Sequence, residues 1–272
     1  MNRLFVAYKP EGIGSNAFLG KLKRKYSVKK AGFSGTLDPF AKGVLVIGFG
    51  SYTKLFRFLN KTPKTYRATL WLGAKSPSLD TENIQEVKIV PPLDEKILAE
   101  TIESFQGNLR YTPPMFSAKK IEGRRAYDLA REGKSVELKE VNSTIYDIKM
   151  LHYMHPFVTF EATVSEGTYI RSLGELIAKK FALEGSLSML ERLREGKFVY
   201  EDEKALDIRD ALAIEKNIYT GEFDNLKYGR KLALEDFTNQ KDGYYFVDSG
   251  TFLSVIRIEN GQVKYELGRI EC

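Results

Sequence analysis

The carboxylate best suited to chemistry in this sequence belongs to Asp38, in the glycine-rich segment Gly32-Phe33-Ser34-Gly35-Thr36-Leu37-Asp38-Pro39. Residues 1–75 contain fifteen Lys or Arg but only two acidic residues, Glu11 and Asp38. Nearby cations favour the ionised form of a carboxylate, which is the form that acts as a nucleophile or a base. The structural alternative is that Asp38 only initiates the turn at Pro39, as Asp-Pro pairs commonly do.

Several other chemistries lack their usual residue patterns in this sequence. The sequence has no Gly-x4-Gly-Lys-Ser/Thr phosphate loop and no Gly-x-Ser-x-Gly elbow, and Gly12-Ile13-Gly14 lacks the third glycine of a dinucleotide fingerprint. Glycoside hydrolysis generally requires two carboxylates, whereas this loop offers one. The single cysteine, Cys272, and the two histidines, His152 and His155, are too few for a metal cluster. We therefore expect a protein with no cofactor and no metal.

Positive charge is concentrated near the N-terminus. The net charge is only +6, but six cations fall within residues 21–30: Lys21, Lys23, Arg24, Lys25, Lys29 and Lys30. Such a run favours a polyanionic partner, because contacts to phosphates release counterions and supply affinity that is independent of sequence. A solvated helix face is the alternative reading of the same run.

Membrane and export signals are missing from the sequence. No stretch approaches the roughly 18 apolar residues that a membrane span requires. The segment Met1 to Pro10 lacks the apolar run and the cleavage site of a secretory signal. We therefore expect a cytoplasmic protein with no membrane contact.

Local sequence patterns predict the elements that position Asp38. Residues 32–39 are expected to form a loop, followed by the start of a helix and an apolar run at 44–47. Strands are predicted where apolar residues alternate or cluster, at residues 4–7, 65–72, 136–150, 157–164 and 186–200. Helices are predicted from a cap at Ser15 or Asn16 to about residue 26, from Ser51 or Thr53 to 59, from a cap at Asp94 to 105, and at 127–131, 170–181 and 208–215.

The C-terminal part of the sequence has a different pattern. From about Tyr244 it predicts two β-hairpins, with turns at Asp248-Ser249-Gly250 and Glu259-Asn260-Gly261. The whole pattern indicates an α+β fold with a mixed β-sheet. We expect a catalytic domain at residues 1–205 and a small β-rich C-terminal module at residues 206–272.

Five motifs in order carry a resemblance to a known family. Residues 32–45 closely follow the signature Gly-Thr-Leu-Asp-Pro-x-Ala-x-Gly-x-Leu. The other motifs are Lys9-Pro10-x-Gly12, Lys64-x-Tyr66, Pro113-Pro114-Met115-Phe116-Ser117-Ala118 and Gly167-Thr168-Tyr169-Ile170-Arg171-Ser172-Leu173. Over about residues 4–200 the chain resembles the bacterial tRNA pseudouridine synthase family of the TruB type.

The resemblance implies a fold, a reaction and a partner. The fold would be a pseudouridine-synthase catalytic domain with a PUA-like RNA-binding module behind it. The reaction would be the cofactor-free isomerisation of uridine 55 in the T-loop of tRNA to pseudouridine. The target base would be flipped out of its stack, at a cost of a few kcal/mol. The protein would be a monomer that binds the T-arm of tRNA without an obligate protein partner.

The resemblance also implies roles for individual residues. Asp38 matches the catalytic aspartate, Tyr66 the tyrosine that stacks on the target base, and Arg171 the arginine that pairs with the aspartate. Without the motifs, Tyr66 could equally be a core residue and Arg171 a phosphate contact. The residues expected on the substrate or RNA side are Lys9, Phe33, Tyr169, Leu193, Lys119, Lys120, Arg124, Arg125, Lys23 and Arg24. Lys9 is expected to shape the loop beside the site.

The chain departs from the family pattern at several positions. Phe33 stands where the family usually has His, and residues 80–83 keep only part of a family motif. Two other readings remain open at this point. One is an RNA-binding protein that keeps the scaffold but performs no reaction, and the other is a nucleoside hydrolase or glycosidase that releases free uracil.

Overall fold

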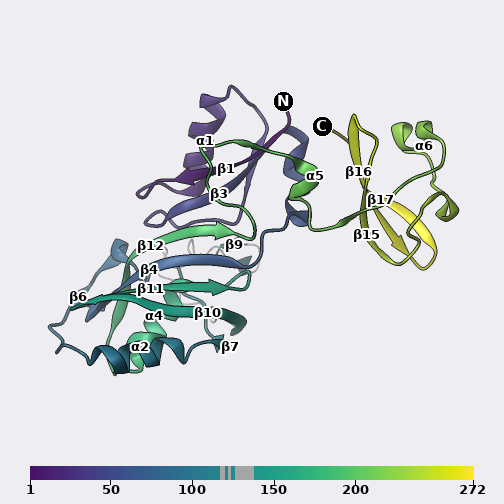
Figure 1. The fold of residues 1–272 in the computed structure, drawn as a ribbon. Coiled ribbons are helices and arrows are strands. Elements are labelled where there is room, and N and C mark those ends of the chain that lie inside the picture. Colours follow the sequence, from purple (N-terminus) through teal and green to yellow (C-terminus); the bar gives the residue numbers. More distant parts are fainter. Residues whose placement is uncertain (117–119, 122–123, 126–137) are drawn as a thin grey trace.

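Nine strands form one mixed sheet that spans most of the chain (Figure 1). The computed structural model describes residues 1–116, 120–121, 124–125 and 138–272. The strands of the large sheet are β1 (Arg3–Lys9), β2 (Ala31–Ser34), β3 (Lys42–Phe49), β4 (Lys64–Leu72), β7 (Gly107–Tyr111), β10 (Val141–Met154), β11 (Phe157–Val164), β12 (Gly185–Glu195) and β13 (Ala205–Leu206). Their order is β13-β1-β3-β12-β4-β11-β10-β7, with β2 also paired to β3.

One parallel pairing makes this sheet mixed. Strands β3 and β12 run parallel where Lys42 and Gly43 face Glu191 and Arg192. The other pairings in the sheet are antiparallel. β12 therefore joins two antiparallel halves, one built on β1 and β3 and the other on β4, β11 and β10. The expectation of an α+β fold with a mixed sheet is confirmed.

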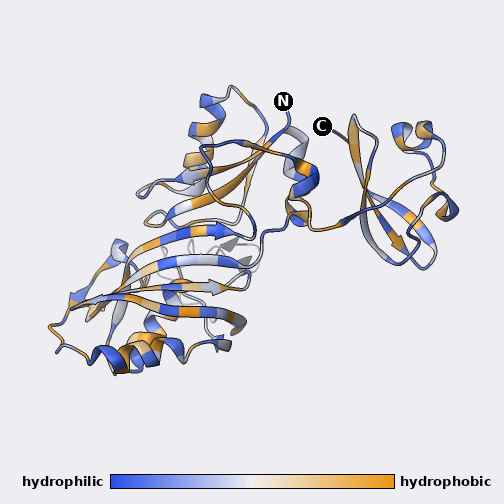
Figure 2. Cartoon of the chain, viewed as in Figure 1, coloured by the Kyte–Doolittle hydropathy of each residue, from blue (hydrophilic) through white to orange (hydrophobic). Residues whose placement is uncertain are grey.

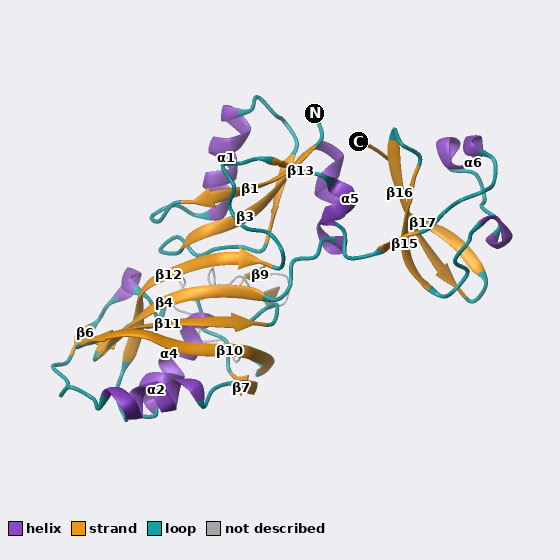
Figure 3. Cartoon of the chain, viewed as in Figure 1, coloured by secondary structure: helices purple, strands orange, loops and turns teal. Residues whose placement is uncertain are grey.

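Helices pack against the large sheet and against the strands near the C-terminus (Figure 3). The helices are α1 (Ser15–Lys25), α2 (Glu95–Glu103), α4 (Ile170–Lys179), α5 (Ile208–Ala211) and α6 (Phe223–Tyr228), with 3-10 turns η1 (Gly50–Phe58), η2 (Thr81–Asn83) and η3 (Leu234–Asp236). Helices α2 and α4 share a core with β4 and β11, where Leu98, Leu173 and Phe160 are buried. Helix α1 buries Phe18 and Leu22 against β1 and β3 and keeps most of its lysines exposed, which gives the mixed colours along it in Figure 2.

A second, four-stranded sheet follows near the C-terminus. It consists of β14 (Glu215–Lys216), β15 (Gly243–Asp248), β16 (Phe252–Glu259) and β17 (Gln262–Glu271), in that order. The last three strands form the two predicted hairpins, and both Asn260 and Gly261 take positive φ in the second turn. Such a turn matches the twist of its flanking strands. Short ladders also pair β5 (Ala74–Lys75) with β6 (Glu86–Val87) and β8 (Lys120–Ile121) with β9 (Arg124–Arg125).

The two sheets share part of their hydrophobic core. One buried cluster contains Val6, Leu55 and Phe58 from the N-terminal part of the chain together with Leu253 and Val255 of β16. The expected boundary between residues 205 and 206 falls inside β13, which pairs with β1 of the large sheet. In the described part of the chain, no helix has the length and apolar character needed to cross a membrane.

Several local predictions were wrong in ways that have physical causes. Residues 31–34 pair with β3 instead of joining the loop, and no helix starts after Pro39 because β3 begins at Lys42. The Ser15 hydroxyl does not cap α1, because it bonds to the backbone of Leu37 instead. The helix predicted at 208–215 ends at Ala211. The helix predicted at 127–131 and the first residues of the strand predicted at 136–150 lie outside the described residues.

Candidate active site

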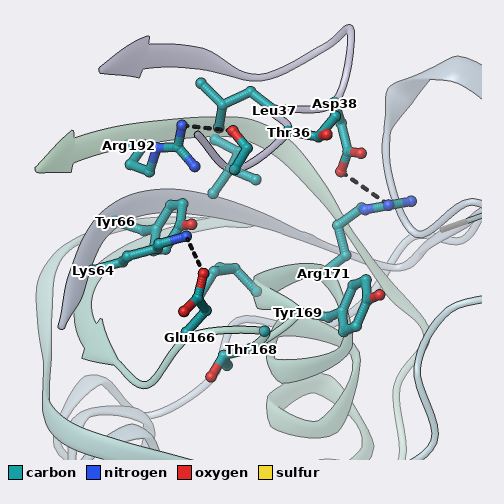
Figure 4. A pocket seen from close by; sticks show the side chains of 14 residues that line it. Thr36, Leu37, Asp38, Lys64, Tyr66, Glu166, Thr168, Tyr169, Arg171 and Arg192 are labelled. Carbon is teal, nitrogen blue, oxygen red and sulfur yellow. Dashed lines mark hydrogen bonds and ion pairs between the residues drawn. The ribbon is translucent and has the colours of Figure 1, made fainter. Parts of the chain in front are cut away.

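One pocket brings together residues from four distant parts of the sequence. It has a volume of about 370 Å³ and is lined by the loop 35–38, by Lys64 and Tyr66 of β4, by residues 166–171, and by Leu190 and Arg192 of β12. Figure 4 shows Asp38, Tyr66, Tyr169 and Arg171 around this space. The three residues predicted to act together, Asp38, Tyr66 and Arg171, therefore share one pocket.

Asp38 and Arg171 form an ion pair at the edge of the pocket. The Nη2 atom of Arg171 lies 2.9 Å from Oδ2 of Asp38. The Arg171 side chain is 4% exposed and the Asp38 side chain 34%, so the carboxylate is the partner that solvent or a ligand can reach. Arg171 occupies the first turn of α4, two residues after the extended residue Tyr169. The ion pair fixes the direction of the carboxylate as well as its charge.

The guanidinium of Arg171 is held on its other sides by the protein. Its Nη1 atom donates to the Ser78 carbonyl at 2.6 Å and lies 3.4 Å from Oδ2 of Asp80, and its Nη2 atom donates to the Phe116 carbonyl at 2.7 Å. Asp80 is itself fixed by the Ser78 hydroxyl and by the backbone N–H of Glu82. Arg171 is therefore a rigid partner for Asp38, because little freedom remains to its side chain.

The pKa of Asp38 is raised from the ordinary aspartate value of 3.8. Burial is the largest cause, because a low-dielectric surrounding disfavours the charged carboxylate. The positive charges of Arg171 and Lys9 oppose this effect, while the negative charge of Asp80 adds to it. Because its pKa is raised, the Asp38 carboxylate is a stronger base than an ordinary aspartate.

The loop that carries Asp38 is tied to the N-terminal segment. The Ser15 hydroxyl donates to the Leu37 carbonyl and accepts from the Leu37 N–H, both at 2.9 Å. Lys9 is fully buried, and its Nζ atom donates to the carbonyls of Pro10, Ile13 and Pro39 at 2.9, 2.7 and 3.4 Å. Burial lowers the pKa of Lys9 from 10.5 to about 8. These contacts join Lys9 to the carbonyls around the loop, and its amino group is too buried to contact RNA.

Two tyrosines stand on opposite sides of the pocket. Tyr66 follows Lys64 by two residues on β4, so both side chains lie on the same face of the sheet. Tyr66 is 9% exposed and offers a flat surface at the wall of the pocket. Tyr169 precedes α4, and its N–H donates to the hydroxyl of Tyr111 at 2.8 Å. A planar base could be held against such a wall by stacking.

The other residues predicted on the substrate side are more scattered. Phe33 lies on β2, opposite Ile47 of β3, and packs beside a core cluster; it is not part of the pocket lining. Leu193 is not part of the lining either; the leucine of β12 that lines the pocket is Leu190. Lys23 and Arg24 occupy the last turn of α1. Lys120, Arg124 and Arg125 lie on the β8–β9 ladder, and Lys119 lies outside the described residues.

Sequence reasoning missed several residues of the site. Lys64 was noticed only as part of a motif, while Glu166, Leu190 and Arg192 were not singled out, although all four line the pocket. Asp80 was noted only as part of a degenerate motif, yet it lies against Arg171. The alternation of side chains along β4 could have pointed to Lys64 from the position of Tyr66. Nothing in the local sequence signals the others, because they come from distant elements.

The geometry suits one kind of chemistry. Two carboxylates line the pocket, Asp38 and Glu166. Glu166 pairs with Lys61 and Lys64, whereas Asp38 has a raised pKa and pairs with the fixed guanidinium of Arg171, near the flat wall formed by Tyr66. This arrangement can attack or deprotonate one atom of a bound planar substrate. The described residues contain no group of three or more His, Cys, Asp or Glu able to hold a metal ion.

Comparison with protein families and curated proteins gives consistent matches. Residues 23–170 match the family model described as TruB family pseudouridylate synthase (N terminal domain). The chain is 63% identical over 273 residues to tRNA pseudouridine synthase B of Sulfurimonas denitrificans, with 100% of both chains covered. It is 50% identical over 271 residues to the protein of that name from Campylobacter jejuni subsp. jejuni serotype O:23/36, covering 100% of this chain and 99% of the relative.

Solved structures support the same architecture at much lower sequence identity. The chain aligns with a structure described as a Cbf5-Nop10-Gar1 complex at a TM-score of 0.69 and 19% identity, covering 99% of this chain and 84% of the other. A structure of an archaeal box H/ACA sRNP Nop10-Cbf5 complex aligns at a TM-score of 0.68 and 18% identity, covering 98% and 85%. These two likenesses concern the fold alone.

Proposed function

This chain belongs to the TruB family of pseudouridylate synthases, and from that premise we propose that it isomerises uridine to pseudouridine in tRNA. The proposal extends to one position, uridine 55 of the T-loop. The observation that carries it is the pairing of Asp38 with Arg171 in a pocket whose other wall is Tyr66. Relatives of 63 and 50% identity that carry the name tRNA pseudouridine synthase B support the same substrate.

The target uridine must leave its stack before Asp38 can reach it. The C1′ and C5 atoms of a nucleotide are not accessible inside a stacked loop, so the base is flipped into the pocket. Unstacking costs a few kcal/mol, which contacts with Tyr66 and the pocket walls offset. A loop is a better substrate than a duplex because its bases can be splayed out at lower cost.

The reaction exchanges one bond of the sugar for another. The ionised Asp38 carboxylate acts at the ribose, either by attack on C1′ or by removal of a ribose proton, and the bond from C1′ to N1 breaks with its electron pair leaving on uracil. The uracil rotates, and C5 forms the new bond to C1′. In the first route the bond between Asp38 and C1′ breaks as the new bond forms, and in the second route the proton held by Asp38 returns to the ribose carbon. The proton on C5 is then lost, and N1 gains a proton. Atoms and electrons balance without a cofactor and without water.

Three neighbours support Asp38 in this scheme. Arg171 keeps the carboxylate ionised and aimed at the sugar, since the guanidinium is fixed by Ser78, Asp80 and Phe116. Tyr66 stacks on the uracil and is placed to assist removal of the C5 proton. Leu190 at the pocket wall excludes water from the released base.

The rest of the chain binds the RNA in this proposal. The exposed cations of α1 and the loop after it, together with the basic β8–β9 ladder, contact the tRNA backbone. Residues 1–205 act as the catalytic domain and residues 206–272 as a PUA-like RNA-binding module. The protein acts as a monomer in the cytoplasm and needs no obligate protein partner.

Tritium release tests the reaction directly. A tRNA labelled with tritium at C5 of uridine loses the label only when C5 forms the new bond to the sugar. We expect release with the wild-type protein and none with Asp38→Asn, while tRNA affinity persists. Glu11→Gln serves as the matched control, because Glu11 is the other acid of the basic N-terminal segment. Full turnover by Asp38→Asn would refute the role of Asp38.

The same assay separates the competing functions. A protein that only binds RNA would release no tritium at any enzyme concentration. A nucleoside hydrolase or glycosidase would produce free uracil and an abasic RNA, whereas isomerisation leaves the mass of the RNA unchanged. Mapping the modified position in the product then tests uridine 55.

A further inference from the structure

A buried arginine outside the proposed catalytic set bridges the base of the Asp38 loop. Arg192 on β12 is 1% exposed. Its Nε atom donates to the Val44 carbonyl at 2.8 Å and its Nη2 atom donates to the Gly35 carbonyl at 3.0 Å. Gly35 begins the loop that carries Asp38, and Val44 lies on β3 just after the loop ends. One guanidinium therefore holds both ends of this loop.

A buried glutamate on the same strand, Glu195, also contacts the start of the Asp38 loop. Glu195 is fully buried, and its Oε1 atom accepts a hydrogen bond of 2.7 Å from the Ser34 hydroxyl. Its Oε2 atom lies 3.3 Å from Nη2 of Arg192, and its Oε1 atom lies 3.5 Å from Nζ of Lys64. Arg192 thus holds Gly35 through its carbonyl, and Glu195 holds the preceding residue, Ser34, through its hydroxyl.

The backbone around Arg192 fits the loop closely. Gly35 has a φ of +62°, and a Cβ there would lie 2.9 Å from Nζ of Lys64 and 3.2 Å from Nη1 of Arg192. Gly43 has a φ of +115°, and a Cβ there would collide with the Arg192 carbonyl oxygen. Both positions therefore require glycine. At Gly43 the end of the loop and the backbone of Arg192 are in direct contact.

Arg192 also relates the loop to the opposite wall of the pocket. Its backbone faces Tyr66 of β4 on one side and Gly43 of β3 on the other. The distance between Asp38 and Tyr66 thus depends on Arg192, which contacts both the Asp38 loop and β4. Stability alone is a poor reason for this arrangement, because a buried ion pair is often no more stabilising than apolar side chains of similar size.

We propose that Arg192, together with Glu195, is a positioning pair that sets the place of the catalytic loop relative to Tyr66 and Arg171. This inference rests on the proposed function, because it concerns the geometry of Asp38. Neither side chain needs to touch the substrate. They hold Ser34 and Gly35 in place, and the path of the loop from Gly35 onward then sets the position of the Asp38 carboxylate.

The main test is Arg192→Lys, which keeps the charge but not the planar fork. A lysine cannot hold the Val44 and Gly35 carbonyls in the same geometry, so the loop shifts. We expect the single-turnover rate of isomerisation to fall about 10- to 100-fold, the range that a small misplacement of a reacting group can cost. The affinity for tRNA should stay within about twofold, since no interaction with the RNA is removed.

Two controls make this result specific. Arg67→Lys places the same substitution on β4, where the side chain pairs with Glu161 and is not part of the pocket lining. It should leave the single-turnover rate unchanged. Ser34→Ala removes only the hydroxyl whose hydrogen bond Glu195 accepts, and it should slow the same step by a smaller factor. This second variant tests the proposal even where Arg192→Lys folds poorly.

The pH profile distinguishes positioning from a loss of folded protein. If the loop moves away from Arg171, less positive charge acts on Asp38, and the acid limb of the rate shifts to higher pH. A smaller folded fraction lowers the rate at every pH but leaves the midpoint where it was. Wild-type rates in both Arg192→Lys and Ser34→Ala, or lower rates with an unmoved midpoint, would overturn the proposal. Turnover by Asp38→Asn would instead overturn the proposed function.

Discussion

The Nη2 atom of Arg171 lies 2.9 Å from Oδ2 of Asp38, although one residue lies in the first turn of α4 and the other in the loop after β2. The same nitrogen donates to the Phe116 carbonyl, and the other terminal nitrogen faces Ser78 and Asp80. The guanidinium therefore has both of its terminal nitrogens engaged. This relationship gives Arg171 a function that another cation cannot easily supply.

Arg171→Lys should abolish most of the activity without weakening RNA binding. The ammonium of lysine is a point charge, and it cannot hold Asp38, Ser78 and Phe116 at once. We expect the single-turnover rate to fall by about 100-fold, with tRNA affinity within about twofold of the wild type. Filter binding and tritium release on the same preparation measure the two quantities. A large drop in affinity with a normal rate would show that Arg171 binds phosphate instead.

The rate of isomerisation should fall on the acid side at a higher pH than an ordinary aspartate would give. Burial raises the pKa of Asp38 above 3.8, so the ionised fraction declines as the pH falls through that raised pKa. Asp80→Asn removes a negative charge that contributes to the rise. Its residual activity should therefore show an acid limb at lower pH than the wild type, measured by single-turnover rates across the pH range. A shift in the opposite direction would contradict this electrostatic account.

Lys9→Met should destabilise the fold and alter the dependence of stability on pH. Methionine leaves three backbone carbonyls without their donor, and we expect a decrease of about 1–3 kcal/mol in the free energy of unfolding by urea. The pKa of Lys9 is about 8 in the folded protein and 10.5 ordinarily, so the unfolded chain binds more protons between these values. The wild type should thus gain stability relative to Lys9→Met as the pH rises from about 8 to 10.5.

A matched control for that experiment is Lys96→Met on α2. Lys96 is exposed and pairs with the exposed Glu100 in the next turn, so its replacement should change stability by no more than about 0.5 kcal/mol. The relative stability of this variant should also stay constant over the same pH range. If the wild type gained as much stability relative to Lys96→Met as relative to Lys9→Met over this pH range, the gain could not be assigned to the lowered pKa of Lys9.

Replacing exposed cations of the N-terminal segment by glutamine should lower the salt dependence of tRNA binding. Lys21, Arg24 and Lys29 are exposed, and the slope of log affinity against log salt concentration falls by about 0.7 to 0.9 for each phosphate that the protein no longer neutralises. The triple variant should bind more weakly at low salt and show a shallower slope. The single-turnover rate at saturating enzyme should not change. An unaltered salt slope would show that these three cations do not contact the RNA phosphates.

The motifs allowed much of the site to be predicted from sequence. Asp38, Tyr66 and Arg171 were named on motif evidence, and the structure brings them to one pocket. Their catalytic roles stay predictions. The hairpins near the C-terminus also followed from the sequence, because Asn260-Gly261 takes the positive φ values that such a turn requires.

Other features depended on tertiary contacts that local patterns do not encode. Residues 31–34 carry loop-like glycine and serine, but pairing with β3 makes them a strand. Ser15 has the character of a helix cap, yet its hydroxyl bonds to Leu37. Arg192 and Glu195 resemble ordinary charged strand residues, and only the approach of the Asp38 loop explains their burial.

The hydrophobic cluster common to both sheets has a consequence for the shape of the substrate. Because Leu55 and Phe58 pack with Leu253 and Val255, the C-terminal sheet is not suspended on a flexible tether. The separation between the pocket and that sheet is therefore fixed by packing. If the proposed RNA-binding role of the C-terminal sheet holds, a substrate must present its reactive nucleotide and its second contact at that separation.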